Sequence, residues 1–418
     1  MSATAIASVD LGAARPTEDD GITSGRECDP QAAGLSRRNI DRIWRAAQAL
    51  RRSGAQPGIS LAVRHNGKLV LDRALGFAQG GGPGENGAVV REVMRPDTPV
   101  CLFSASKAVT AVLTHKLAEE GGISLDAPVS YYLPRFARHG KGYVTIADVL
   151  AHRAGVAHPY IPSAECNAAL LQHPECILGY ICDARPRHRG QAGYHAITGG
   201  YLLGAIIERV TGESLNAYLD AKLRRPLDMQ VFTYGLAPKY RAAAARNYVT
   251  GLKLVFPLTA ILKNVLMVDA DAVVDTSNET AFMDAVIPAG NVYATAEELS
   301  RFYQMLLNGG EYGGRQVLAP KTVARLLHPR GSMAIDRMLM IPMRYSEGLM
   351  LGNPGFSLYG HGTVDAFGHL GFMSILGWAQ PSRGNAVGLL TTGKAVLGAH
   401  LLPLWRLLSA IRALPAIA

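Results

Sequence analysis

The stretch that decides both the fold and the chemistry of this chain is Phe103-Ser104-Ala105-Ser106-Lys107-Ala108-Val109-Thr110. It opens an apolar run through Ala118 that contains no Gly or Pro, which predicts a buried helix. Ser104 and Lys107 are three residues apart, so on a helix they share one face. A helix start offers free N–H groups and partial positive charge to an oxyanion at Ser104 Oγ. A lysine in apolar surroundings loses part of its preference for the charged form, so the stretch predicts an activated serine nucleophile.

From this stretch alone, purely structural roles for Ser104 and Lys107 remain open. A serine at a helix start often serves only as a cap, and a lysine can bury its stem while its amine stays in water. Ser106 also adjoins Lys107, but adjacent helical residues point to different faces. Ser104 is therefore the predicted nucleophile.

The composition describes a globular protein. The 418 residues are 48% hydrophobic and 18% charged, which suits one large domain or two interleaved ones. The formal net charge is +9, but the basic residues are dispersed, and the clusters Arg37-Arg38, Arg51-Arg52 and Arg185-Pro186-Arg187-His188-Arg189 have no interleaved aromatic residues. We interpret them as solvated helix faces and a basic loop, and expect no nucleic-acid partner.

Cysteine usage and the chain's first residues bear on the compartment. Five cysteines without a C-x-x-C pair fit free thiols in a reducing compartment. Residues 1–35 lack the pattern of a secretory signal and read as a poorly ordered lead. No uninterrupted apolar run is long enough to span a bilayer. We expect a cytoplasmic protein.

The order of predicted elements indicates an α+β fold. A helix over 36–52 precedes a hairpin of strands 59–65 and 68–76 around Asn66-Gly67. Helices follow after Thr145, over 198–210 and after Thr295, then strands over 345–351, 372–378 and 386–390, and a last helix over 395–414 with a bend at Pro403. We predict a mixed lobe from residues 36–100 and 331–418, and a mainly helical lobe from residues 101–330.

One apolar segment, residues 252–268, permits two interpretations. It is interrupted by Pro257 and is otherwise rich in Leu, Val and Ile. It is either core or a partly exposed flap over an apolar pocket or a membrane surface. The second interpretation motivates a hypothesis of peripheral lipid or membrane contact.

Two further stretches can converge on Ser104. Gly193-Tyr194-His195-Ala196 directly precedes a helix, and its tyrosine can exchange a proton with a substrate. Gly368-His369-Leu370-Gly371-Phe372 opens a predicted strand, where Gly371 permits close approach of a substrate to the strand edge. The Phe372 N–H can then share the substrate carbonyl oxygen with the Ser104 N–H.

In this order the three stretches resemble the serine β-lactamase/penicillin-recognising superfamily, in its class C β-lactamase-like and family VIII esterase branch. That family carries S-x-x-K, then Y-x-N or a variant, then K-T-G or H-x-G. The segment Val149-Leu150-Ala151-His152-Arg153-Ala154-Gly155-Val156 is similar to its L-L-T-H-T-S-G-L segment, and the resemblance covers most of residues 36–395. It implies an antiparallel sheet flanked by terminal helices, beside a helical lobe.

Carried over, the resemblance makes Ser104 the acylated nucleophile, Lys107 its proton partner and Tyr194 the general base and acid. His369, Leu370 and Gly371 replace K-T-G, and Phe372 supplies an oxyanion N–H. The second motif ends in Ala196 rather than an amide, and the third lacks the usual cation and hydroxyl. These departures weaken recognition of an anionic lactam and favour an uncharged small-molecule ester.

The resulting hypothesis is a serine esterase that acts through an acyl-enzyme, without a cofactor or metal. Acyl transfer to a hydroxylated metabolite, weak β-lactamase or D-Ala-D-Ala peptidase activity, and a catalytically silent binding protein remain alternatives. Histidines His361 and His369 flank Asp365, and His152 and His158 flank Gly155, but neither set has a known metal-ligand spacing. No G-x-S-x-G stretch indicates an α/β-hydrolase.

Overall fold

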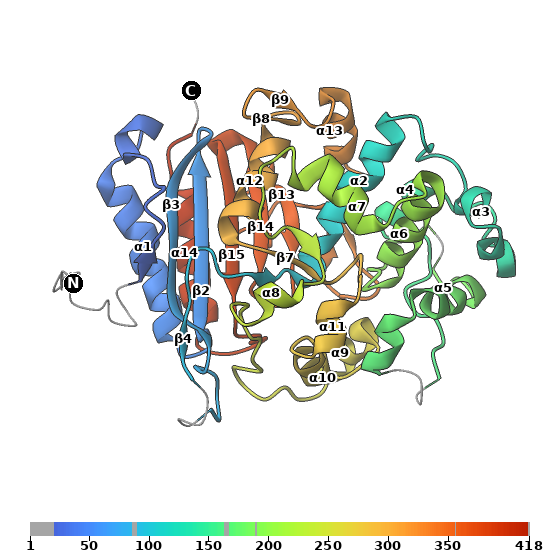
Figure 1. Cartoon of the computed structure of the whole chain (residues 1–418), viewed down its shortest axis with the longest axis horizontal. Coiled ribbons are helices and arrows are strands. Elements are labelled where there is room, and N and C mark those ends of the chain that lie inside the picture. The colour runs from blue at the N-terminus through green and yellow to red at the C-terminus, as the bar shows by residue number, and fades with distance from the viewer. Residues whose placement is uncertain (1–20, 86–89, 163–166, 189, 356, 417–418) are drawn as a thin grey trace, which may run out of the picture.

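The computed structural model describes residues 21–85, 90–162, 167–188, 190–355 and 357–416. A sheet with helices on both faces occupies one side of the molecule, and a group of helices occupies the other (Figure 1). The described strands of the main sheet pair antiparallel in the order β1-β3-β2-β15-β14-β13-β12, with β4 also paired to β3. This is the α+β architecture that the sequence predicted.

The sheet is built from both ends of the chain. Its strands are β1 (Ile22–Thr23), β2 (Gly58–His65), β3 (Lys68–Gln79), β4 (Glu92–Val93), β12 (Met350–Leu351), β13 (Phe367–Leu370), β14 (Leu376–Gln380) and β15 (Asn385–Thr391). The predicted hairpin turn joins β2 to β3, with φ of 49° at Asn66 and 78° at Gly67. Both residues therefore take the left-handed conformation that a two-residue hairpin requires.

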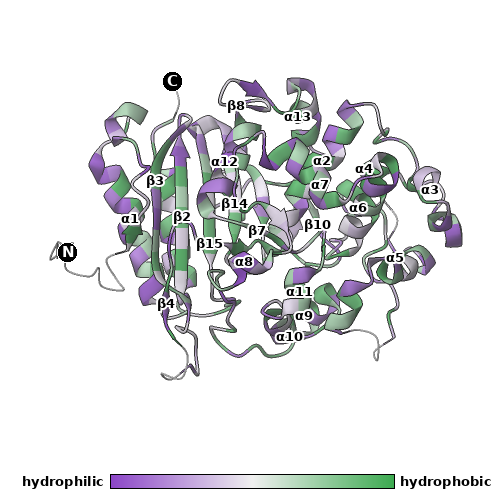
Figure 2. Ribbon diagram, in the orientation of Figure 1, coloured by the Kyte–Doolittle hydropathy of each residue, from purple (hydrophilic) through white to green (hydrophobic). Residues whose placement is uncertain are grey.

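Helices from distant parts of the chain cover the two faces. Helices α1 (Arg37–Arg52) and α14 (Leu401–Arg412) bury their apolar sides on one face, against Leu61, Val63 and Leu389 among others. Helix α12 (Ala296–Leu307) packs on the opposite face. At Gly388 in β15 a Cβ would lie 2.2 Å from the Ala296 carbonyl oxygen, so only glycine permits this close approach. Hydrophobic residues follow the central strands in Figure 2.

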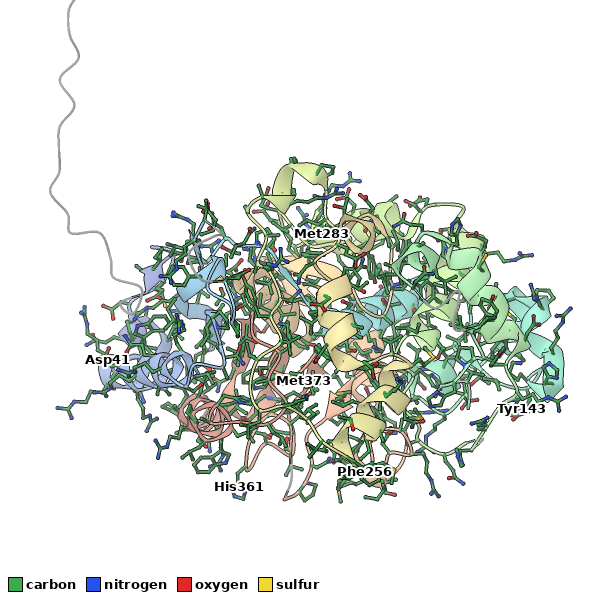
Figure 3. All side chains as sticks on the ribbon, turned by 90° about the horizontal axis from the view of Figure 1, so that it is seen from below. Asp41, Tyr143, Phe256, Met283, His361 and Met373 are labelled. Carbon is green, nitrogen blue, oxygen red and sulfur yellow. The ribbon has the colours of Figure 1, made fainter. Side chains whose placement is uncertain are left out.

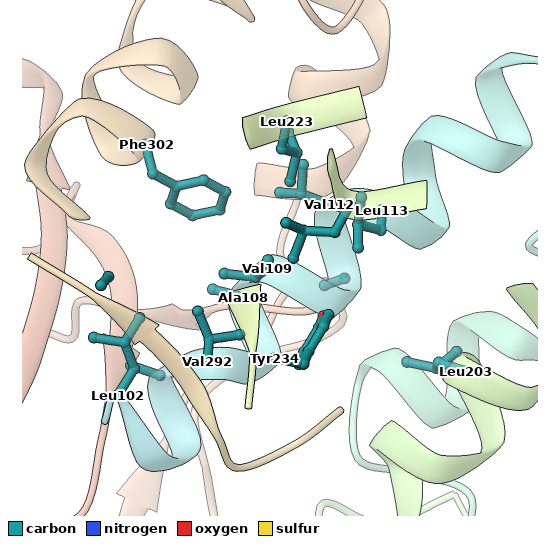
Figure 4. Close-up of a cluster of buried hydrophobic side chains, with 14 of the residues drawn as sticks. Leu102, Ala108, Val109, Val112, Leu113, Leu203, Leu223, Tyr234, Val292 and Phe302 are labelled. Atoms are coloured by element: carbon teal, nitrogen blue, oxygen red, sulfur yellow. The ribbon is translucent and has the colours of Figure 1, made fainter. Parts of the chain in front are cut away.

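The second side of the molecule centres on α2 (Ser106–Glu119), which is buried on all sides through its first ten residues. Leu102, Val109, Leu203 and Phe302 belong to the apolar cluster around it (Figure 4). The surrounding helices are α3 (Val129–Tyr132), α4 (Ile146–Leu150), α5 (Pro174–Asp183), α6 (Thr198–Thr211), α7 (Leu215–Leu219), α8 (Pro238–Arg241), α9 (Leu258–Leu266), α10 (Ala270–Thr276), α11 (Thr280–Asp284) and α13 (Pro320–Leu327).

Short strands complete this side. A small sheet has the order β5 (Val100–Cys101), β7 (Val292–Ala294), β6 (Thr233–Tyr234), and two hairpins pair β8 (Glu311–Tyr312) with β9 (Arg315–Gln316) and β10 (Ala334–Ile335) with β11 (Pro342–Met343). Because β7 pairs with β5, residues 292–294 lie beside the strand that leads into the Ser104 stretch. None of the described helices is both long and apolar enough to cross a bilayer.

Several predicted boundaries were wrong. Residues 21–35 are ordered, because the Cys28 N–H donates to the Leu69 carbonyl at 2.9 Å and Arg26 pairs with Asp72 at 2.7 Å. The helix after Thr145 is short, Ile146–Leu150. Helix α12 lies within the predicted helical region, residues 101–330, yet packs on the sheet.

The predicted C-terminal strands and helix also shift. Residues 372–375 form a buried turn between β13 and β14, and in the segment 345–351 only Met350–Leu351 is a strand. Helix α14 begins at Leu401, so Pro403 lies in its first turn, where its missing N–H costs no hydrogen bond and no bend follows. An apolar pattern does not distinguish a buried turn from a strand, which explains why residues 372–375 were predicted as strand.

The segment 252–268 is largely exposed rather than core. Exposure of the side chain is 66% at Leu252, 69% at Val255 and 82% at Phe256. Phe256 lies at the periphery of the molecule in Figure 3. Farther along the segment, Val265 in α9 is buried and Leu266 faces a cavity.

Candidate active site

Ser104 lies on a sharp turn between β5 and α2. It occupies a 3-10 turn, Phe103–Ala105, directly before the first residue of α2. Phe103 has a φ of 46°, a conformation that bulky residues rarely adopt. Burial of the Phe103 ring against Phe372, with 5.5 Å between ring centroids, holds this turn. Ser104 thus lies at the positive end of the α2 dipole, as its sequence position predicted.

The Lys107 amine is within hydrogen-bond distance of the Ser104 hydroxyl. Its Nζ lies 3.0 Å from Ser104 Oγ and donates to the Ala289 carbonyl oxygen at 3.0 Å. The side chain is buried, and this desolvation holds the pKa of Lys107 well below its usual value. A neutral amine in this position can accept the Ser104 proton.

Ser106, the rival nucleophile, has a structural role. Its Oγ accepts the Val292 N–H at 2.9 Å, and the residue is fully buried. This bond ties the start of α2 to β7. The helix-face argument that favoured Ser104 is consistent with this geometry.

Tyr194 completes the group around Ser104. The Ser104 side chain lies close enough to its phenol to influence the pKa of that phenol, and Lys107 Nζ lies 4.9 Å from its ring centroid. Burial raises the pKa of Tyr194, and the Asp336 carboxylate adds to the increase. The phenol therefore keeps its proton and is suited to donate it.

A buried carboxylate that the sequence did not reveal holds the tyrosine segment. Asp336 Oδ1 accepts the N–H groups of Tyr194 at 3.2 Å, Met338 at 2.8 Å and Leu339 at 2.9 Å. Its Oδ2 accepts the Tyr345 hydroxyl at 2.9 Å. Asp336 is in an irregular stretch before β11 and belongs to no motif, so no sequence signal pointed to it.

His152 supports the same segment from the other side. Its Nδ1 accepts the His195 N–H at 3.1 Å, and its carbonyl oxygen accepts the Gly193 N–H at 2.9 Å. Its ring centroid is 4.9 Å from that of Tyr194. Burial, with smaller contributions from nearby cations, lowers the pKa of His152 well below its usual value. His152 belongs to the segment 149–156, which is similar to the family's L-L-T-H-T-S-G-L segment, and this similarity was the sequence signal for it.

At the third motif, His369 provides an uncharged side chain and not a cation. His369 is buried, and its Nδ1 donates to the Leu370 carbonyl oxygen at 2.7 Å. Burial and the nearby Lys107 charge lower the pKa of His369 to about 3. The ring lies 6.4 Å from that of Tyr194, centroid to centroid. At neutral pH this position is therefore an uncharged imidazole.

Gly371 packs closely against the backbone before Ser104. A Cβ there would lie 2.5 Å from the Leu102 carbonyl oxygen and 2.8 Å from the Ile375 side chain. This close approach requires glycine, and it sets the following residue, Phe372, beside the Ser104 turn. The close approach of a substrate to this glycine stays a prediction.

The N–H groups of Ser104 and Phe372 suit an oxyanion site. Within the part of the chain that the structure describes, neither donates to a protein acceptor. Both residues line the same cavity. Free N–H groups at this position can receive a negative oxygen.

An apolar cavity of about 250 Å³ opens beside Ser104. Its walls come from the turn at Ser104, Ile161, the region 167–177, the Tyr194 segment and α9 to α11. Apolar lining residues include Ile161, Leu170, Leu171, Ile177, Ala196, Ile197, Leu266, Val273, Phe282 and Ile287. No Asp, Glu, Lys or Arg is among the described lining residues, so the cavity suits an uncharged, apolar group.

The residues around the histidines considered as metal ligands make other contacts. Asp365, between His361 and His369, accepts the Ser382 N–H at 2.7 Å and the Gln380 side-chain amide at 3.2 Å. Among the described residues, no three His, Cys, Asp or Glu side chains gather as a metal site would require.

Fold and site geometry together define a class: a β-lactamase/transpeptidase-like α+β protein with an S-x-x-K turn between sheet and helices. The model of the Beta-lactamase family matches residues 41–409. This chain therefore belongs to the Beta-lactamase family and is a hydrolase of that family. The resemblance stated from its motifs is confirmed.

Comparisons with individual proteins agree with this family assignment. The chain is 29% identical over 347 residues to the esterase/β-lactamase LipL of Mycobacterium tuberculosis, covering 80% of this chain and 76% of that protein. A penicillin-binding protein homologue from Caulobacter crescentus superposes with a TM-score of 0.74 at 26% identity, over 89% of this chain and 97% of that one. A family VIII carboxylesterase has the same fold, with a TM-score of 0.75 at 24% identity over 92% and 98% of the two chains.

Proposed function

We propose that this protein hydrolyses uncharged carboxylic esters through an acyl-enzyme on Ser104. The observation that carries the proposal is the 3.0 Å separation of Lys107 Nζ and Ser104 Oγ beside an apolar cavity. The esterase/β-lactamase LipL, 29% identical, supports an esterase assignment. The missing cation at His369 favours an ester over an anionic lactam.

The first half of the reaction forms the acyl-enzyme. Ser104 Oγ attacks the ester carbonyl carbon while Lys107 Nζ takes its proton. The carbonyl oxygen becomes an oxyanion between the Ser104 and Phe372 N–H groups. The carbon–oxygen bond to the alcohol then breaks, and the leaving oxygen receives a proton from the Tyr194 phenol. Protonated Lys107 can return that proton to Tyr194.

Water completes the turnover. It attacks the acyl carbon, gives a proton to Lys107 and releases the carboxylic acid as Ser104 regains its own. Both pKa directions support this division of roles, since burial lowers the pKa of Lys107 and raises that of Tyr194. Lys107 as base and Tyr194 as acid is a different division from the one that the family resemblance implied, in which Tyr194 was base and acid.

The substrate follows from the cavity walls. A volume of about 250 Å³ without described charged groups fits short- to medium-chain acyl groups. If another alcohol reaches the acyl-enzyme before water, the same chemistry transfers the acyl group to that alcohol. Transfer is therefore a second outcome of one intermediate, and product analysis with added alcohols tests it.

The test is hydrolysis of p-nitrophenyl butyrate with labelling by a fluorophosphonate probe. Wild type should turn over the ester and take the label, and Ser104→Ala should do neither. Ser332→Ala, which removes an exposed serine elsewhere, is the matched control and should behave as wild type. Equal turnover by wild type and Ser104→Ala would reject the assignment. A wild type that takes no label and shows no turnover would instead indicate a silent binding protein.

The proposal also covers the cellular location of the protein. The described cysteines Cys28, Cys101, Cys176 and Cys182 are free thiols, which supports a reducing, cytoplasmic setting. Peripheral lipid contact is supported by an exposed apolar surface formed by two segments. The Leu252 N–H donates to the Leu397 carbonyl at 2.9 Å, four residues before α14, and both 252–256 and α14 carry exposed apolar residues.

A further inference from the structure

A second, polar cavity of about 130 Å³ lies next to the tyrosine segment. The basic loop that the sequence suggested to be merely solvated forms one wall, through Arg185, Arg187 and His188. Arg337, His158 and Asn264 form others, and no Asp or Glu is among the lining residues. Three arginines thus line one small cavity.

Backbone hydrogen bonds fix these walls. The Arg187 N–H donates to the Gly155 carbonyl at 2.8 Å, and the Arg337 N–H donates to the Ala192 carbonyl at 3.0 Å. Gly155 has a φ of 72°, and a Cβ there would lie 2.5 Å from the Arg187 carbonyl oxygen. The loop is therefore seated against the protein and does not simply extend into solvent.

The cations in this cavity lack anionic partners. In the described chain, Arg185, Arg187 and Arg337 form no ion pair, and all three are exposed at the protein surface. The Arg337 guanidinium donates to the Gln191 side-chain oxygen at 3.0 Å. Like charges held together cost free energy unless an anion joins them.

A histidine adds an unsatisfied polar atom. His158 Nε2 is buried and has no hydrogen-bond partner. His158 lines the cavity and lies close enough to Arg187 for the guanidinium charge to act on it. His158 therefore adds a further nitrogen-bearing side chain to the wall of this basic cavity.

We propose that this cavity binds a phosphate group, either a free phosphorylated molecule or a phospholipid headgroup. Guanidinium groups present paired N–H donors that match phosphate oxygens, and a dianion balances more than one arginine. A single carboxylate would leave most of the positive charge unmatched. This site is separate from ester hydrolysis, although Gly193 lines it while the next residue, Tyr194, lines the apolar cavity.

Calorimetric titration of the full chain with inorganic phosphate tests the proposal. Wild type should bind, and the triple variant Arg185→Gln/Arg187→Gln/Arg337→Gln should bind at least about tenfold more weakly, since one charged hydrogen bond is worth about that factor. Arg38→Gln, an exposed arginine on the distant helix α1, removes the same kind of charge and should bind as wild type. Absence of binding to wild type, or equal losses in the triple variant and Arg38→Gln, would overturn the site.

Asn264→Asp offers an independent variant of nearly unchanged size. It places a carboxylate at the exposed rim of the cavity and should weaken phosphate binding without altering the fold, as measured by thermal unfolding. Unchanged phosphate affinity in this variant would also count against the proposal.

Vesicles distinguish the two sources of phosphate. Phosphatidylcholine vesicles with and without phosphatidic acid are compared in flotation with wild type and the arginine triple variant. An arginine-dependent increase with phosphatidic acid assigns a lipid headgroup, and inorganic phosphate binding without that increase assigns a free phosphorylated molecule. Neither response in wild type would overturn the proposal.

Discussion

Asp336 holds the backbone N–H of Tyr194 at 3.2 Å across 142 residues of sequence. The same carboxylate accepts two more N–H groups and the Tyr345 hydroxyl. A single buried side chain thus connects the irregular region before β11 to the phenol beside Ser104. We infer that Asp336 is a positioning residue for Tyr194.

Asp336→Asn should lower kcat about 10- to 100-fold with little change in KM, because a small displacement of a reacting group is costly. The amide cannot accept at both of its polar atoms, so the free energy of unfolding should also fall by about 1–3 kcal/mol. Steady-state kinetics and urea unfolding measure the two effects. A variant that loses stability but keeps its kcat would show that Asp336 has only a structural role.

The pH dependence of kcat/KM should report the Lys107 base. Because burial lowers the pKa of Lys107, the acidic limb of the profile should lie well below the usual lysine value. Activity should fall as the pH drops through that pKa, since the protonated amine cannot accept the Ser104 proton. Tyr194→Phe should retain the acidic limb of the pH profile, with a lower kcat/KM at each pH. Loss of the acidic limb in that variant would assign the base to Tyr194 instead.

A second buried lysine should make stability depend on pH. Burial lowers the pKa of Lys394 from 10.5 to about 7, and Nζ donates to the Thr391 carbonyl at 2.5 Å. Between these values the unfolded chain binds the proton and the folded chain releases it, so the free energy of unfolding should rise with pH by up to about 1.4 kcal/mol per unit. Lys394→Met should remove this slope between pH 8 and 10. Parallel unfolding curves for the two proteins would refute the assignment.

The apolar cavity should limit acyl chain length. Ala272→Trp places a large ring at the lining and should reduce turnover of octanoyl esters at least about tenfold, while acetyl esters are little affected. A chain-length series of p-nitrophenyl esters measures this. Ala260→Trp, on the exposed side of α9, should leave the series unchanged. A uniform loss across all chain lengths in Ala272→Trp would place the acyl group elsewhere.

The exposed apolar surface should bind lipid weakly. The side chains of Phe256, Leu402 and Trp405 are 82%, 54% and 54% exposed. Replacing all three by serine should reduce flotation with phosphatidylcholine vesicles several-fold, because less apolar area enters the interface. Tyr160→Ser, also 82% exposed but outside these segments, is the control. If wild type remains wholly unbound, the lipid hypothesis fails.

The sequence predicted those features that depend on local patterns. The Asn66-Gly67 turn, the helix after Thr295 and the Ser104 and Lys107 spacing each involve residues near one another in the chain, and the structure contains all three. Asp336 and the free arginines around the polar cavity depend on contacts between distant segments, which no local pattern encodes. The turn at 372–375 was predicted as strand because its apolar residues reflect burial and not strand pairing.

The most direct test of the central claim is to trap the acyl-enzyme. Wild type mixed with p-nitrophenyl butyrate and quenched with acid should show one added butyryl group by intact mass, located on the peptide that carries Ser104. Tyr194→Phe should form it more slowly, because the phenol protonates the leaving oxygen during acyl-enzyme formation. A butyryl group on any other residue, or hydrolysis at full rate in Ser104→Ala, would contradict the account.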